Sequence, residues 1–171
     1  EMVGRVMEER SLNEDNEAEI VGEVEKEERG IFGVTNPDKV EVTVDSGASQ
    51  SVWPRKMKGV RRYYEKPPKL IAANGTAIPA YGKAVLGFQR GGVKGEMKFW
   101  DADVKKPLGA VSAMIDEGNT VVFSSKKSYV RNDLSGEEIE IKRKGGTFVI
   151  ELSKETKAQP KKKEEKGKMA V

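Results

Sequence analysis

The segment 40–44 carries a valine at every second position, with Glu41 and Thr43 between the valines. This period of two predicts a strand with one buried face. Asp45, Ser46 and Gly47 follow directly, and these residue types favour a tight turn. A carboxylate at the end of a rigid strand is held in position, as a catalytic acid or base must be.

The strand followed by Asp45, Ser46, Gly47 and Ala48 resembles the active-site turn of aspartic proteases, specifically of the retropepsins. In that family two identical turns meet at a two-fold axis, and each chain supplies one Asp. The resemblance implies that Asp45 is catalytic and that the three residues after it form the active-site turn. An ordinary strand-to-turn junction is the alternative, because Asp-Ser-Gly is a common turn sequence.

A second element lies in residues 67–78, where Asn74 and Gly75 stand between two extended arms. Asn-Gly is a strong signal for a hairpin whose turn needs positive φ at both central positions. Retropepsins carry a flap hairpin at a similar distance after the catalytic Asp. The resemblance therefore implies that Ala72, Ala73, Asn74 and Gly75 form a flap that contacts the peptide substrate, and a purely structural hairpin is the alternative.

Residues 84–88 and 97–100 have strand character, and we expect them to form a hairpin around a loop containing Gly91, Gly92 and Gly95. The charges that follow on Asp101 and Asp103 indicate a solvated strand face. Two carboxylates without further oxygen ligands are a weak signal for a cation site.

The sequence Pro107-Leu108-Gly109-Ala110 precedes a short helix that we expect at residues 111–117, ended by Gly118. Retropepsins have a hydrophobic-hydrophobic-Gly element at this point, behind the active-site turn. The resemblance implies that Leu108 and Gly109 support the Asp45 turn from below.

The stretches 108–113 and 116–123 resemble the protease region of copia-type retrotransposon polyproteins, and further strands are expected near residues 129–130, 139–141 and 147–152. The resemblance covers roughly residues 38–152. It implies a mostly β, retropepsin-like closed β-barrel lobe with one short helix and a flap hairpin. The half-site of such a lobe is completed by homodimerisation.

The two ends of the chain differ from its middle in charge. Residues 1–29 carry 11 acidic and 4 basic side chains, and residues 154–171 carry 7 lysines and 3 glutamates. We expect residues 1–37 to be an acidic disordered segment and residues 153–171 a lysine-rich disordered tail, because charge runs without apolar periodicity bury little surface. The tail could contact nucleic acid, but we rank a solvated linker above that function.

The chain contains no cysteine and no histidine. This excludes disulfides, Ser-His and Cys-His catalysis and the common zinc sites. We expect no cofactor, no metal site, no membrane span and a cytoplasmic location. Because the sequence starts at Glu1 rather than Met, we expect it to be part of a longer polyprotein.

These observations lead to two hypotheses of function. The first is an aspartic endopeptidase that acts as a homodimer on peptide segments of its own retroelement polyprotein. The second is a catalytically silent retropepsin-like module for dimerisation or peptide binding. Three departures from the family pattern motivate the second hypothesis. Pro107 stands where a bulky aliphatic residue is usual, and Trp53 stands where a smaller apolar residue is usual. The flap turn also contains a single glycine.

Overall fold

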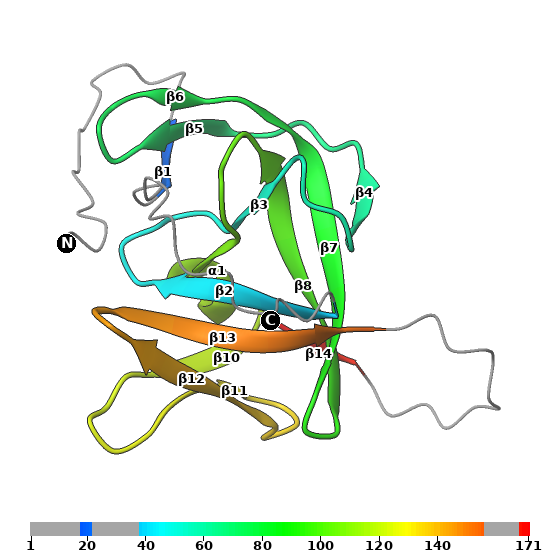
Figure 1. The fold of residues 1–171 in the computed structure, drawn as a ribbon, viewed down its shortest axis with the longest axis vertical. Helices are drawn as coiled ribbons and strands as arrows, with labels where there is room; N and C mark the ends of the chain where they lie inside the picture. The colour runs from blue at the N-terminus through cyan, green and yellow to red at the C-terminus, as the bar shows by residue number, and fades with distance from the viewer. Residues whose placement is uncertain (1–17, 22–37, 156–167) are drawn as a thin grey trace, which may run out of the picture.

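The computed structural model describes residues 18–21, 38–155 and 168–171, and this part of the chain is mostly β with one short helix (Figure 1). The elements are β1 (Ala18–Val21), β2 (Lys39–Asp45), β3 (Val52–Pro54), β4 (Arg61–Tyr63), β5 (Lys69–Ala72), β6 (Ala77–Ile78), β7 (Ala80–Arg90), β8 (Val93–Ala102), β9 (Leu108–Ala110), α1 (Val111–Asp116), β10 (Asn119–Val122), β11 (Ser128–Asn132), β12 (Glu138–Lys144), β13 (Thr147–Lys154) and β14 (Met169–Ala170). The expected mostly β class is confirmed.

Most of the described strands belong to one sheet, with the order β10-β11-β12-β13-β2-β9-β3-β8-β7-β4. Strand β13 runs antiparallel to β2 along most of its length, and its last residues, Ser153 and Lys154, also pair with β7. The pairings from β13 through β2, β9, β3, β8 and β7 therefore return to β13. A smaller sheet of β1, β5 and β6 lies at the top of Figure 1.

The alternating valines of β2 face the core, as the sequence predicts: Val40, Val42 and Val44 are all buried. Trp53 on β3 is also fully buried, with its ring centroid 5.2 Å from that of Phe99 on β8. Its indole N–H donates to the carbonyl oxygen of Met57 at 2.9 Å, so the polar atom of this large side chain is satisfied. The bulky residue on the strand after the turn is therefore part of the core.

The β7–β8 hairpin is confirmed, with Gly91 and Gly92 in its turn at positive φ. Gly95 was expected in the loop but lies within β8. A Cβ at this position would come within 2.5 Å of both the Met169 carbonyl oxygen and the Phe88 ring. Gly95 therefore allows β14 and Phe88 to approach β8 closely, a packing role that a local sequence pattern does not reveal.

The expectations for the two ends are corrected where the structure describes them. In the segment 1–37, Ala18–Val21 forms β1, and the rest lies outside the described residues. In the segment 153–171, Ser153 and Lys154 belong to β13, and β14 pairs in parallel with β8. Met169 and Val171 are buried, because two apolar side chains at alternate positions find a place beside β8. Most of the tail lysines lie in 156–167, outside the described residues, so their contact with nucleic acid stays a prediction.

Gly109 on β9 is enclosed by core side chains. A Cβ there would lie 2.6 Å from the terminal methyl of Met114, 2.8 Å from that of Met97 and 3.3 Å from a methyl of Val42. Both methionine side chains are buried, so their ends have little room to move. The absence of a side chain at Gly109 lets β9 pack closely against Met114, Met97 and Val42.

Gly109→Ala is expected to lower the free energy of unfolding by about 1–3 kcal/mol, the usual cost of overpacking a filled core. Gly87→Ala is the matched control, because a Cβ there meets only the flexible Glu155 side chain within 4 Å. Urea unfolding of the two variants beside the unaltered chain measures the difference. Equal stability of the two variants would contradict the packing assigned to Gly109.

Candidate active site

Asp45 is the last residue of β2, and its position is fixed by strand pairing on both sides of the element. On one side β2 pairs in parallel with β9, so that Asp45 lies opposite Ala110 and Val44 opposite Gly109. On the other side the strand pairs with β13 up to Val44. The carboxylate therefore stands where a well-anchored strand ends.

The turn after β2 is closed by Asp45 itself. Its Oδ1 accepts a hydrogen bond of 2.7 Å from the Gly47 backbone N–H, the two-residue pattern typical of an Asx turn. The conformation of the carboxylate is thus fixed by the local backbone. The Asp-Ser-Gly pattern predicts this turn, and the structure has it.

The environment of Asp45 favours the protonated form. Burial raises the pKa of the Asp45 carboxyl above its ordinary value, while hydrogen bonds from the backbone of Gly47 and Ala48 act in the opposite direction. Burial is the largest of these effects because it disfavours the charged carboxylate. A carboxyl that keeps its proton at higher pH than usual is suited to acid–base chemistry.

The three residues after Asp45 have different surroundings. Ser46 is exposed, Gly47 is half-buried, and Ala48 is only 3% exposed. Ala48 packs in a hydrophobic cluster with Leu108 and Ala110 of β9. The alanine that the sequence suggested for the turn is therefore a core residue, and the exposed serine hydroxyl is the group free to face a second molecule.

Two serines that the sequence analysis did not single out connect the turn to β9 and α1. The buried Ser51 hydroxyl oxygen accepts a hydrogen bond of 2.9 Å from the Ala110 N–H. The Ser112 hydroxyl lies 3.3 Å from the Ala48 carbonyl oxygen and 3.2 Å from that of Ser49. Their partners are about 60 positions away in the sequence, so no local pattern could have identified them.

The expected β5–β6 hairpin is present, and Ala73, Asn74 and Gly75 form the three-residue loop that the hydrogen bond between Ala72 and Thr76 closes. The Gly75 N–H donates to the Ala72 carbonyl oxygen, and the Ala72 N–H donates to the Thr76 carbonyl oxygen, both at 2.8 Å. Of these three loop residues, only Gly75 has a positive φ, at +83°. The expectation of positive φ at both Asn74 and Gly75 is corrected, because a three-residue loop needs a left-handed residue only at its last position.

The hairpin packs against the same apolar cluster as the Asp45 turn. Leu70 of β5 and Ile78 of β6 are buried in the cluster that contains Ala48 and Leu108, and Ala72 packs against it. The structure thus brings together residues of the predicted turn, the predicted hairpin and the predicted supporting strand. Figure 1 shows the hairpin above the end of β2 and α1.

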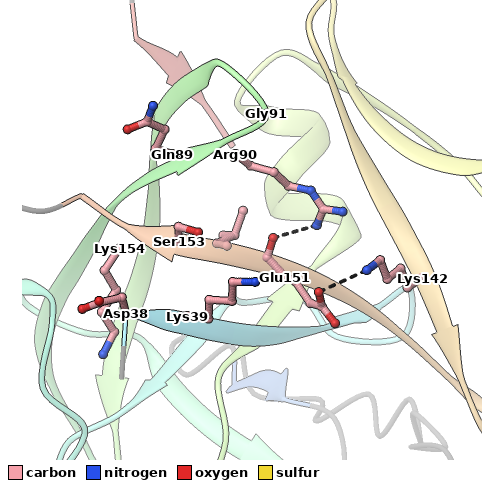
Figure 2. Close-up of a pocket in the computed structure, with 10 residues that line it drawn as sticks. Asp38, Lys39, Gln89, Arg90, Gly91, Lys142, Glu151, Ser153 and Lys154 are labelled. Atoms are coloured by element: carbon pink, nitrogen blue, oxygen red, sulfur yellow. Dashed lines mark hydrogen bonds and ion pairs between the residues drawn. The ribbon is translucent and has the colours of Figure 1, made fainter. Parts of the chain in front are cut away.

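A cavity of about 580 Å³ lies elsewhere, among Asp38, Lys39, Gln89, Arg90, Gly91, Lys142, Glu151, Leu152, Ser153 and Lys154 (Figure 2). It contains none of the predicted site residues. Arg90 donates to the Glu151 carbonyl oxygen at 2.7 Å, and Lys142 pairs with the Glu151 carboxylate at 3.1 Å. Lys142 and Glu151 form an ion pair within this lining, and the cavity is a surface hollow between β2, β7, β12 and β13.

The acidic pair at the end of β8, Asp101 within the strand and Asp103 just after it, differs from the expected solvated face. Asp101 is only 5% exposed, and its Oδ2 pairs with the Arg62 guanidinium at 3.2 Å, while Oδ1 has no hydrogen-bond partner. Asp103 is exposed and accepts a hydrogen bond of 2.8 Å from the Tyr81 hydroxyl. The ion pair was missed because Arg62 lies on β4, 39 positions before Asp101.

Within residues 18–21, 38–155 and 168–171, no group of three or more acidic side chains is arranged to hold a metal ion. The helix in this part of the chain is too short to cross a membrane. No protein-family model, curated protein or solved structure matches the chain.

Asp45→Asn is expected to change the pH dependence of folding stability. The folded chain raises the pKa of Asp45, so its stabilising effect is complete below the unfolded pKa and is lost as the pH rises through the folded pKa. Asn does not titrate. The variant should therefore gain stability relative to the unaltered chain as the pH increases from 3 to 7.

Urea unfolding at several pH values, at a protein concentration where the chain is monomeric, measures this difference. Asp133→Asn is the control, because Asp133 is exposed and Asn keeps the oxygen that accepts from Thr120. A stability difference for Asp45→Asn that does not vary with pH would contradict the role of burial.

Proposed function

We propose that the chain is one half of a homodimeric aspartic endopeptidase of retropepsin type, which cleaves peptide segments of its own retroelement polyprotein. The observation that carries the proposal is the anchored Asp45 carboxyl, whose pKa is raised by burial and whose turn shares an apolar cluster with the β5–β6 hairpin. The hairpin is the flap of this proposal. The return of the strand pairings to β13 supports a closed lobe.

Two copies of the Asp45 turn complete the site across a two-fold axis. Two carboxyl groups about 3 Å apart share one proton, because like charges at that distance do not both ionise. Desolvation of Asp45 within one chain already favours the protonated form. The exposed Ser46 hydroxyl is available for hydrogen bonds between the two turns.

The reaction needs only these two carboxyl groups and a water molecule. The ionised Asp45 takes a proton from the water while the protonated copy polarises the scissile carbonyl group. The water oxygen forms the new bond to the carbonyl carbon. The Asp45 that took the proton then passes it to the amide nitrogen, and the carbon–nitrogen bond breaks. No covalent enzyme intermediate, metal or cofactor takes part.

Asp45→Asn should reduce cleavage by at least about 100-fold, because a positioned acid–base group contributes about 10²–10⁴-fold to the rate. The substrate is the Asp45→Asn chain, so that cleavage occurs only in trans. The unaltered chain serves as the enzyme at pH 4–7, and mass spectrometry locates the cut. Cleavage should increase more steeply than linearly with enzyme concentration, because a monomer has half a site.

Asp133→Asn serves as the matched control and should cleave as the unaltered chain does. Sedimentation of the Asp45→Asn chain shows whether it still forms dimers. Cleavage by Asp45→Asn at the unaltered rate would refute the proposal.

A peptide-binding module without hydrolysis is the second candidate. The pairing of β1 with β5 favours it, because one edge of the hairpin already holds an extended segment of polypeptide. Dimers that bind extended peptides but cleave none at any pH tested would support this alternative.

A further inference from the structure

The smaller sheet contains a strand from a distant part of the chain. Strand β1 pairs in parallel with β5, with Ala18 opposite Lys69 and Val21 opposite Ala72. The strand order is β1-β5-β6, so β1 occupies the edge of β5 that the hairpin leaves open. In the view of Figure 1, β1 is drawn between the hairpin and the end of β2.

An open strand edge presents unpaired N–H and C=O groups, which an extended segment can pair with. Addition of a strand to such an edge is a common mode of peptide recognition, in which main-chain hydrogen bonds supply much of the affinity. A two-stranded hairpin is also marginally stable alone, and a third strand stabilises it. The β5 edge therefore has a physical reason to bind an extended segment.

The location of this edge connects it with the candidate active site. Leu70, in the middle of β5, is buried in the cluster that includes Ala48 of the Asp45 turn and Leu108 of β9. A strand that pairs with β5 therefore extends the small sheet that packs against the Asp45 turn. The four residues of β1 include Ile20 and Val21, which are β-branched and favour extended backbone.

We propose that the segment Ala18–Val21 occupies the peptide-binding edge of the β5–β6 hairpin in cis and excludes a peptide that would bind there in trans. The occupant belongs to the same chain, and 16 residues (22–37) connect it to Asp38. Because β1 binds within its own chain, a free peptide must compete with an intramolecular occupant, whose effective concentration does not fall on dilution. The effect on cleavage rests on the proposed function, whereas the exclusion of peptide does not.

The direct test uses a reversible cross-link. Cys at position 18 and position 69, in the variant Ala18→Cys with Lys69→Cys, would lie opposite each other in the β1–β5 register. The chain has no cysteine of its own, so the engineered pair is the single disulfide that can form within one chain. The Asp45→Asn substitution is included so that hydrolysis does not affect the measurement.

The probe is a fluorescent synthetic peptide with the sequence of residues 14–25, and anisotropy measures its affinity. Oxidation should weaken binding at least tenfold relative to the reduced protein, because the cross-link keeps the edge occupied. Equal affinity of the oxidised and reduced forms would overturn the proposal. A cross-link that joins two chains on a denaturing gel would also overturn it, because the strand would then come from a second copy.

A second variant removes the pairing. Glu19→Pro with Ile20→Pro deletes two backbone donors of β1, and proline is poorly tolerated within a strand ladder. This variant should bind the peptide at least tenfold more tightly than the unaltered chain and show faster hydrogen exchange in Lys69–Ala72. The control is Asn13→Pro with Glu14→Pro, which places two prolines in the same segment before β1. Binding and exchange that are the same in both double variants would overturn the proposal.

The two proposals fail separately. Peptide exclusion by β1 without any cleavage would refute the endopeptidase but leave the cis-bound strand intact. Cleavage by the unaltered chain, together with peptide binding that neither the cross-link nor the prolines change, would refute the cis-bound strand alone.

Discussion

The parallel pairing of β2 with β9 is the interaction on which the candidate site depends. It places Asp45 opposite Ala110 and Val44 opposite Gly109, where a side chain would collide with Met114 and Met97. The Ser51 hydroxyl then accepts from the Ala110 N–H, so the loop after the turn is attached to the same strand. Without β9, the strand that ends at Asp45 would pair with β13 alone.

The same arrangement disfavours the charged form of Asp45 and makes its carboxyl group suited to acid–base chemistry. Burial raises the pKa of Asp45, because it disfavours the charged carboxylate. A structural turn does not require a desolvated carboxyl group, since exposed Asp residues close turns equally well. The proposed pairing of two such carboxyls uses this property, because a shared proton is most stable where each group resists ionisation.

Local patterns predicted much of the fold because they depend on neighbouring residues. The valine alternation predicted β2. Gly91 and Gly92 predicted the β7–β8 turn, and Gly118 predicted the end of α1. Features made by distant segments were not predictable in this way. Strand β13 joins β2 and β7, Arg62 pairs with Asp101, and Ser51 supports Ala110, each through residues at least 39 positions apart. The turn and hairpin residues of the site were placed by pattern, but their common apolar cluster emerged only in three dimensions.

The measurement that tests the central claim most directly is the titration of the Asp45 carboxyl carbon by NMR, at low and high protein concentration. If two Asp45 groups share a proton in a dimer, the carboxyl should titrate in two separate steps at high concentration and in one step when dilute. The same single step at every concentration, with dimers present, would contradict a paired-carboxyl site.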